Sequence, residues 1–287
     1  MAEKRTYFGF EQNPYQSAST VVIPVPFERS TSYLKGTAHA PQAILEASDS
    51  LEFYDIETDS EPFLSGIHTT PAISSLENES TPEFFERLKN AVSDMLRDDK
   101  FFVILGGEHS LSYPVVHAFV EHFPRISVLH IDAHADLRDE YLGDPLSHAC
   151  ALRRIRDVTS ETVSVGIRSM SAKEAKYVKK ERPVIFYDHQ LHHSDFPIEE
   201  ILAALNDDVY ITFDLDGLNP AEMPSVGTPE PGGLSWHETL ALFDELFQRK
   251  NVLGMDVVEL KPDSVNVHSD FLAAKLIYKA IALKYHQ

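Results

Sequence analysis

Three apolar segments of the sequence, FFVILGG, ISVLHI and VYITF, are each followed by side chains of the kinds that bind metal ions. Carboxylates that converge in one cleft repel each other, and a buried carboxylate without a partner is costly. Divalent cations remove both problems, because carboxylates are their natural hard ligands. The residues placed in this way are His109, Asp132, His134, Asp136, Asp214 and Asp216.

The spacing of these residues predicts their arrangement. Side chains alternate between the two faces of an extended backbone, so Asp132, His134 and Asp136 are expected to share one face, as are Asp214 and Asp216. Four aspartates and two histidines exceed the ligand number of a tetrahedral Zn²⁺ site. They suit two metal ions that share carboxylates, and the oxygen-rich set favours Mn²⁺ over Zn²⁺. Two ions about 4 Å apart can hold a bridging hydroxide, a nucleophile available near neutral pH.

Each of these motifs alone has a plainer explanation. Helix caps and turns also use Asp-x-Asp pairs, and a single histidine after Gly-Gly is a weak indication of a metal ion. The coincidence of all three motifs at the ends of apolar segments is what favours a metal centre.

Seven short apolar segments alternate with helical patterns and predict the strands of a sheet covered on both faces. We expect a three-layer α/β/α fold with a central, mainly parallel sheet. In such sheets binding sites lie at the carboxyl ends of the strands. No repeat or linker interrupts the sequence, so a single domain is expected over residues 1–287. The predicted strand segments are STVVIPV, FFVILGG, ISVLHID, TVSVGIR, PVIFYD, VYITFDLD and NVLGMDVVEL.

Helix signals stand at three places. Thr81 is expected to cap a helix that has Pro82 as its first residue, and Ser235 with Glu238 forms a possible capping box. The segment DFLAAKLIYKAIALKY is also helical in its pattern.

The formal net charge of −20 disfavours nucleic acid and anionic membranes as partners. The simplest interpretation is a surface that keeps the protein in solution; steering of a cationic substrate is the alternative. Cys150 is the single cysteine, which excludes an internal disulfide and fits a reducing compartment. The N-terminus has no signal-peptide pattern, and no apolar run approaches the roughly 18 residues of a membrane span. We therefore expect a cytoplasmic protein.

Five longer motifs extend over nearly the whole chain. They are FERSTSYLKGTAHAPQAI, GGEHS, HIDAHADLRDEYLGDPLSHAC, FDLDGLNPAEMPSVGTPEPGGL and MDVVELKP. In these motifs the sequence resembles the ureohydrolases of the arginase/agmatinase superfamily and is most similar to agmatinase-like members. The resemblance implies an arginase-like fold, a small cationic guanidino substrate, and assembly as a homotrimer or homohexamer.

The resemblance also implies a centre of two Mn²⁺ ions per subunit, bridged by Asp132 and Asp214. The ligands of one ion would be His109, Asp132, Asp136 and Asp214. The ligands of the other would be Asp132, His134, Asp214 and Asp216. His130, which shares the strand segment with Asp132, is expected to pack beneath the site without binding metal.

Two further residues acquire roles from the resemblance. Glu259 matches the acidic residue that holds the substrate guanidinium, and His148 matches a proton-shuttling histidine. The chemistry agrees: paired hydrogen bonds from Glu259 can orient a poorly electrophilic guanidinium carbon, and a group titrating near neutrality can protonate the departing amine. Without the motifs, Glu259 could be a solvated acid and His148 a structural histidine. A Cys150–His148 nucleophile pair is disfavoured, because the metal centre already supplies a nucleophile.

The loop before His148 bears on the substrate. Arginase-like members have a Ser-Gly-Asn-type stretch there, whereas this chain has GDPLS (143–147), with the acidic Asp139 and Glu140 nearby. Acidic residues at the rim suit a substrate whose far end is an ammonium group. We therefore expect hydrolysis of agmatine to putrescine and urea, a step of polyamine biosynthesis. An aminopropyl-extended agmatine is the close alternative, and arginine is less favoured.

Two other function classes remain open at this stage. A dinuclear phosphoesterase is weakened by the negative charge and by the lack of an evident phosphate clamp. A catalytically silent metal-binding protein is weakened by the full set of ligand and catalytic residues. The sequence departs from the usual family pattern at Glu108, where Asp is common, and in DGLNP (216–220), where Asp-Cys-Leu-Asp-Pro is common.

Overall fold

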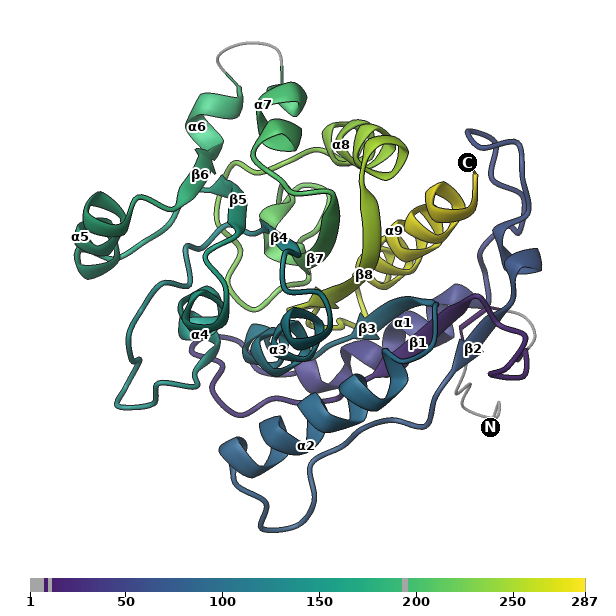
Figure 1. Cartoon of the computed structure of the whole chain (residues 1–287), viewed down its shortest axis with the longest axis horizontal. Coiled ribbons are helices and arrows are strands. Elements are labelled where there is room, and N and C mark those ends of the chain that lie inside the picture. Colours follow the sequence, from purple (N-terminus) through teal and green to yellow (C-terminus); the bar gives the residue numbers. More distant parts are fainter. Residues whose placement is uncertain (1–7, 10–11, 193–195, 287) are drawn as a thin grey trace.

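A sheet of eight strands runs through the computed structural model, which describes residues 8–9, 12–192 and 196–286. The strand order is β2-β1-β3-β8-β7-β4-β5-β6, and neighbouring strands pair in parallel (Figure 1). The strands are β1 (Thr20–Pro24), β2 (Ile67–Thr69), β3 (Phe101–Leu105), β4 (Ser127–Ile131), β5 (Thr162–Ile167), β6 (Val184–Tyr187), β7 (Asp208–Asp214) and β8 (Asn251–Val258).

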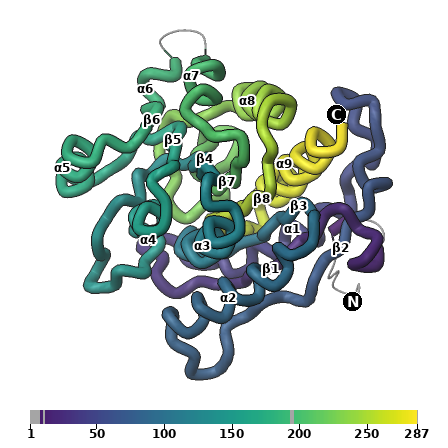
Figure 2. The backbone as a smooth tube through the Cα atoms, in the orientation of Figure 1, coloured from purple at the N-terminus to yellow at the C-terminus, as the bar shows by residue number. Residues whose placement is uncertain are grey.

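Helices cover both faces of the sheet, so the expected three-layer α/β/α fold is confirmed (Figure 2). One core lies beneath α1, α7, α8 and α9, and a second lies beneath α2, α3 and α4. The helices are α1 (Ala40–Ser48), α2 (Thr81–Met95), α3 (Ser112–His122), α4 (Ala151–Val158), α5 (Ala172–Glu181), α6 (Asp188–Leu191), α7 (Ile198–Ala203), α8 (Trp236–Arg249) and α9 (His268–Tyr285).

The central strands show why the sheet needs both layers. In β3 the side chains of Val103 and Leu105 belong to one core, whereas Phe102 and Ile104 belong to the other. Each of these residues is almost completely buried, and full burial of such a side chain contributes roughly 1.5–3 kcal/mol. Continuous apolar runs therefore correctly predicted strands buried on both faces. The three-residue strand β2 was not predicted, because it is too short to show a pattern.

The capping box of Ser235 and Glu238 is confirmed at the start of α8. The expected cap of α2 is wrong by one residue. Ser80, and not Thr81, is the N-cap: its hydroxyl accepts the N–H of Glu83, whose carboxylate accepts the N–H of Ser80 in return. Pro82 is consequently the second helical residue.

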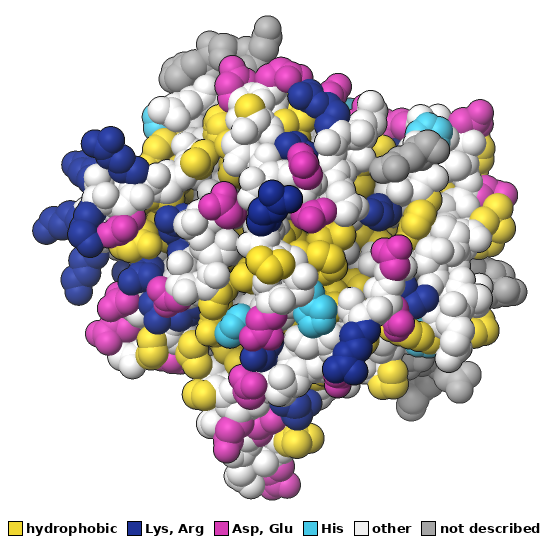
Figure 3. Space-filling view, viewed as in Figure 1, with side chains coloured by type: hydrophobic (Ala, Val, Ile, Leu, Met, Phe, Trp, Pro, Cys, Tyr) yellow, Lys and Arg dark blue, Asp and Glu magenta, His cyan; other side chains and the backbone are white. Residues whose placement is uncertain are grey.

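On the face drawn in Figure 3, acidic and basic side chains are interspersed, and lysines and arginines gather over α5. Negative charge forms no single patch on this face of the described chain, which favours the solubility interpretation there. None of the helices in the described ranges has the length and apolar character needed to cross a bilayer.

Candidate metal centre and active site

The four adjacent strands β3, β8, β7 and β4 end at the same edge of the sheet, because all of them run in parallel. This edge gathers side chains from four distant parts of the chain, as expected for a parallel α/β sheet. His134 retains 25% of its side-chain exposure, and the others are nearly or completely buried. The six residues brought together are those expected from the sequence: His109, Asp132, His134, Asp136, Asp214 and Asp216.

His109 lies at the centre of one group of carboxylates. Its Nδ1 is 3.1 Å from Asp132 Oδ2, 3.3 Å from Asp136 Oδ2 and 3.2 Å from Asp214 Oδ2. Within the described part of the chain, this buried nitrogen has no hydrogen-bond partner, whereas Nε2 lies 3.0 Å from Thr212 Oγ1. A nitrogen lone pair surrounded by carboxylates is repulsive unless a cation lies between them. The donor set therefore fits a bound metal ion.

A second group forms around His134. Its Nδ1 lies 2.9 Å from Asp216 Oδ2 and 3.6 Å from Asp132 Oδ1. Asp132 thus turns one oxygen to each group, the placement that a bridging carboxylate requires. Asp214 contacts His109 through Oδ2, whereas its Oδ1 accepts the backbone N–H of Asp216.

The electrostatics of the protein alone show that this site demands positive charge. Burial raises the pKa of Asp214 well above its ordinary value, and Asp216 and Asp132 raise it further. Burial opposes ionisation of His134, but Asp216 and Asp132 outweigh it and raise the pKa of His134 to about 12. The carboxylates thus draw protons to the site, and divalent cations can take the place of those protons.

The expected regular alternation after β4 is wrong in detail. The strand ends at Ile131, and the following residues form an irregular loop in which Asp136 has a φ of 48°. The loop is tied to the end of β5 by the N–H groups of Arg168 and Ser169, which both donate to the carbonyl of Ala133. The acidic side chains converge because of this loop and not because a strand continues.

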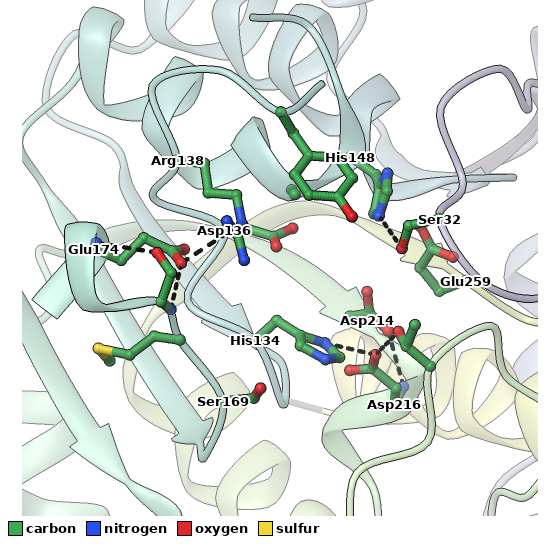
Figure 4. Close-up of a pocket in the computed structure, with 15 residues that line it drawn as sticks. Ser32, His134, Asp136, Arg138, His148, Ser169, Glu174, Asp214, Asp216 and Glu259 are labelled. Atoms are coloured by element: carbon green, nitrogen blue, oxygen red, sulfur yellow. Dashed lines mark hydrogen bonds and ion pairs between the residues drawn. The ribbon is translucent and has the colours of Figure 1, made fainter. Parts of the chain in front are cut away.

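A pocket of about 290 Å³ opens beside the metal-type residues (Figure 4). Glu259 lines it, with only 7% exposure and a backbone φ of 65°, a conformation uncommon outside glycine. Its Oε1 accepts the N–H of His109 at 2.7 Å. Burial raises the pKa of Glu259 well above its ordinary value, so the carboxylate is primed for a cationic partner.

His148 lies across the pocket from His134, in the turn that precedes α4 (Figure 4). Its ring nitrogens lie near two serine hydroxyls, with Nδ1 3.2 Å from Ser30 Oγ and Nε2 3.3 Å from Ser32 Oγ. Glu259 and His148 thus line one pocket together with metal-type residues, namely His134, Asp136, Asp214 and Asp216.

The expected acidic rim is different from the one observed. Among the described residues that line the pocket, neither Asp139 nor Glu140 is present. The carboxylate of Asp139 instead lies 3.2 Å from Arg154 on α4 and 3.6 Å from Arg153. The acidic residue at this end of the pocket is Glu174, together with Ser169, Met170, Ser171, Arg138 and Tyr141.

Glu174 is held by the start of α5. Its carboxylate accepts the N–H of Ser171 at 2.7 Å and the N–H of Leu137 at 3.0 Å. The Nε of Arg138 lies 3.7 Å away, and the guanidinium of Arg138 stacks over the ring of Tyr141. Glu174 was not predicted at the pocket, because its Ser-x-x-Glu spacing with Ser171 indicates a helix cap and it follows a different strand from the acidic motifs.

Several polar residues support the site, and of those named next only His130 was expected there. Glu108 accepts hydrogen bonds from two backbone N–H groups and two serine hydroxyls. His130 lies 2.8 Å from Asp132 and 3.1 Å from Ser164, beneath the site as expected. Thr212 donates to Asp256 on β8. The available signal was that polar residues interrupt strands that are otherwise wholly apolar.

Cys150 does not resemble a nucleophile. Its side chain is buried, and its Sγ lies 3.8 Å from the carbonyl of Asp144. Burial raises the pKa of the thiol to about 12, so little thiolate forms near neutral pH.

The sequence matches the arginase family over residues 18–283, and the chain belongs to this family. It is 40% identical over 283 residues to an N(1)-aminopropylagmatine ureohydrolase of Thermus thermophilus, covering 98% of this chain and 95% of that protein. It is 33% identical to an agmatinase of Halalkalibacterium halodurans over 264 residues, covering 89% of this chain and 88% of that one. The crystal structure of an agmatine ureohydrolase of Thermoplasma volcanium superposes with a TM-score of 0.88 at 32% identity, covering 99% of this chain and 96% of that chain.

The expected enzyme class is therefore confirmed. The protein is a ureohydrolase that acts on guanidino compounds, a hydrolase of amidine C–N bonds, and its family binds a binuclear metal centre. The phosphoesterase alternative finds no support in this membership.

Proposed function

We propose that this protein hydrolyses N(1)-aminopropylagmatine to urea and the remaining triamine, with agmatine as the second candidate substrate. The observation that carries the proposal is the pocket, which has Glu259 on one side and Glu174 on the other (Figure 4). Carboxylates on opposite sides match a substrate that has a guanidinium at one end and an ammonium at the other. Both candidate substrates have this charge pattern.

The choice between the two substrates rests on the relatives. Identity is 40% to the protein named N(1)-aminopropylagmatine ureohydrolase and 33% to the one named agmatinase. The acidic loop residues Asp139 and Glu140 favour an ammonium-ended substrate over arginine, and they do not separate agmatine from its aminopropyl derivative. Asp139 moreover turns away toward α4, so the loop gives no reason to prefer agmatine.

We also propose that the cofactor is a pair of Mn²⁺ ions. His109, Asp132, Asp136 and Asp214 would hold one ion, and Asp132, His134, Asp214 and Asp216 the other. Two observations support this assignment: the Nδ1 of His109 has no hydrogen-bond partner among the described residues, and Asp132 faces both groups. When bound, the ions supply a nucleophile at neutral pH by lowering the pKa of water.

The protein's own residues would orient the substrate and move one proton. Glu259 would accept two N–H groups of the guanidinium, which fixes the carbon while Oε1 stays anchored to the backbone of His109. Water adds to that carbon, and the bond from the carbon to the alkyl nitrogen then breaks. The products are urea and an amine. The departing nitrogen takes up a proton, and His148 at the mouth of the pocket is the proposed donor.

We propose a homotrimer or homohexamer for the assembly. Three apolar side chains near α9, those of Tyr54, Ile56 and Leu64, are exposed by 48%, 82% and 71% in the single chain. Burial against other copies would remove this apolar surface from water. Light scattering on the purified protein would test this proposal, and a monomer would contradict it.

Urea release from aminopropylagmatine, agmatine and arginine, with and without added Mn²⁺, tests the proposed function. We expect the highest kcat/KM with aminopropylagmatine, less with agmatine, and little with arginine. A higher kcat/KM for agmatine would reverse the assignment of substrate. No urea from any of these compounds would favour the catalytically silent alternative.

A further inference from the structure

A chain of polar contacts behind His148 joins three parts of the sequence. Glu108 follows β3, Ser30 belongs to the FERSTS segment after β1, and His148 precedes α4. Ser30 Oγ lies 2.7 Å from Glu108 Oε1, 2.8 Å from the backbone nitrogen of His148, and 3.2 Å from His148 Nδ1. The proposed functions above give no role to Ser30 or Glu108.

The direction of each hydrogen bond follows from what each group can offer. A serine hydroxyl has one proton to donate and two lone pairs to accept. Glu108 is surrounded by donors, namely the N–H groups of Arg29 and Ser30 and the hydroxyls of Ser30 and Ser110, so its carboxylate acts as an acceptor. Ser30 therefore gives its proton to Glu108 and accepts from the backbone N–H of His148.

Toward Ser30, this leaves one role for Nδ1 of His148. Ser30 has no second proton, so the 3.2 Å contact is attractive only when Nδ1 carries the hydrogen and donates it to Ser30. The hydroxyl of Ser147, 3.3 Å from the same nitrogen, can share that N–H as a second acceptor. In the neutral ring Nε2 then holds the lone pair, and the hydroxyl of Ser32 at 3.3 Å can donate to it from the pocket side.

We infer that Ser30 and Glu108 are positioning residues that hold His148 in its Nδ1–H tautomer, with Nε2 directed to the pocket. The inference rests on the proposed role of His148 as proton donor. A histidine of this tautomer takes up a proton at the Nε2 lone pair, delivers it from the imidazolium to the departing amine, and returns to the Nδ1–H form, so Nε2 must be presented in a fixed direction. Without the Ser30 acceptor, the ring populates both tautomers, and a smaller fraction is competent.

The tautomer can be measured directly by ¹⁵N nuclear magnetic resonance of the histidine rings. The full-length protein would carry diamagnetic Zn²⁺ in place of Mn²⁺, and the His148 signals would be assigned by their loss in His148→Gln. At a pH where the ring is neutral, we expect a protonated Nδ1 and an unprotonated Nε2. In Ser30→Ala the signals should shift toward a mixture of tautomers. An Nε2–H tautomer in the wild-type protein, or an unchanged spectrum in Ser30→Ala, would overturn the inference.

Kinetics of the Mn²⁺-loaded protein provide a second readout. Ser30→Ala should lower kcat about tenfold, which is only part of the roughly 10²–10⁴-fold that a general acid contributes to the rate. The KM should stay within about twofold of the wild-type value, and the metal content should not change. Ser30→Thr keeps the hydroxyl and should restore most of kcat. Thr31→Ala is the matched control, because the Thr31 hydroxyl donates to Glu28, outside this chain of contacts. If Thr31→Ala lowered kcat as much as Ser30→Ala, the effect of Ser30 would come from stabilising the loop and not from its contact with His148.

Glu108→Asp shortens the carboxylate and should reduce kcat as Ser30→Ala does. Because the two residues act in series, the double variant should lose little more than either single variant. Full additivity of the two losses would contradict the proposed pair. If none of the candidate substrates yields urea, the proposed function fails, but the resonance measurement still decides the tautomer.

Discussion

The imidazole of His109 has a different environment at each of its two nitrogens. Nε2 lies next to the hydroxyl of Thr212, which donates to Asp256, and Tyr210 donates to the other oxygen of that carboxylate. Asp256 is completely buried, and burial raises its pKa. Because the Thr212 proton goes to Asp256, Thr212 can only accept from Nε2–H. The lone pair of Nδ1 is therefore directed at the carboxylates on the other side.

Asp132 is the residue whose loss should affect the metal centre most, because it faces both histidines of the centre. Asp132→Ala should lower the metal content below two ions per subunit and reduce turnover about a thousandfold or more, since several kcal/mol of charge stabilisation is lost. Elemental analysis and urea release measure both effects. His148→Gln is the comparison: it should keep both ions and lose about a hundredfold in kcat. If Asp132→Ala still bound two metal ions per subunit, Asp132 would not bridge them. If His148→Gln lost metal, His148 would be a metal ligand and not a proton donor.

The sequence could predict residues whose positions follow from strand ends, and it failed where a loop sets the direction of a side chain. Asp132 and Asp214 stand directly at the ends of parallel strands, and His109 follows shortly after β3, so their convergence follows from topology. Asp139 lies in a loop and turns to the arginines of α4, a contact that spacing does not reveal. Glu174 contributes from a helix start, where its Ser-x-x-Glu spacing with Ser171 predicts a capping box and not a place at the pocket.

At the scale of elements, the same reciprocal cap starts three helices, α2, α5 and α8. Ser80 and Thr81 are both suitable cap residues, and the spacing to Glu83 decides between them, because a capping box needs the acid three residues after the cap. Pro82 favours Thr81 as the cap, because proline is common at the first helical position, but the capping box of Ser80 and Glu83 overrides this preference. The correct start of α2 can therefore be predicted from the local sequence.

The cap of α8 offers a measurable contribution to stability. Ser235→Ala removes the hydroxyl that accepts the N–H of Glu238 at 3.2 Å and should lower the free energy of unfolding by about 1 kcal/mol. Ser235→Asp supplies another capping oxygen and should remain near the wild-type value. Urea denaturation of the three proteins provides the comparison. Equal stability of the alanine variant would mean that water replaces the cap at no cost.

A buried ion pair attaches the segment after α1 to the C-terminal helix. Asp55 and Lys279 are both almost completely buried, with Nζ 2.9 and 3.0 Å from the two carboxylate oxygens. Burial opposes ionisation of Asp55, but the ammonium of Lys279 and the donors of Thr58 outweigh it and lower its pKa. A carboxyl group with a lowered pKa in the folded state contributes stability above its unfolded pKa, and that stability is lost as the pH falls through the folded value.

Asp55→Asn should therefore destabilise the protein near neutral pH by roughly 1.5–3 kcal/mol, because it removes the charge-assisted hydrogen bonds of Asp55 with the buried ammonium of Lys279, which keeps Glu57 as a carboxylate partner. The difference from wild type should begin to shrink as the pH falls below about 4, where Asp55 of the unfolded chain takes up a proton, and should disappear below the lowered pKa of Asp55 in the folded state. Denaturation with a metal chelator present, from pH 3 to 7, isolates this effect. Glu52→Gln in the same segment, an exposed position, is the control. A difference that is constant with pH would exclude the ion pair as its cause.

For the whole molecule, the sequence predicted the layers and most of the strands, because buried parallel strands are apolar on consecutive residues. It did not predict the strand order, which places β8, the last strand, between β3 and β7. This order depends on pairing between segments about 150 residues apart, such as Val103 with Met255. No local pattern encodes such a pairing.

Removal of the metal should lower the thermal stability of the whole fold. A ligand that binds only the folded state raises the free energy of unfolding by about 2.7 kcal/mol when its concentration is a hundred times its dissociation constant. For a chain of this size, that increase corresponds to a rise in Tm of roughly 5–10 °C. We expect calorimetry to show this loss after chelation and its recovery with Mn²⁺. Asp132→Ala should respond much less to Mn²⁺, and an equal response would place the stabilising ion elsewhere.

The position of β8 in the middle of the sheet has a consequence for the order of events during synthesis. His109 and Asp132 leave the ribosome long before Glu259, whose backbone N–H binds the carbonyl of Gly107 only after β8 has inserted beside β3. An N-terminal fragment that ends before β8 lacks Glu259, the carboxylate proposed to bind the substrate. It also lacks the strand that pairs with β3. With Glu259 in its proposed role, capture of substrate becomes possible only when β8 has paired, and we expect an unfinished chain to have no activity.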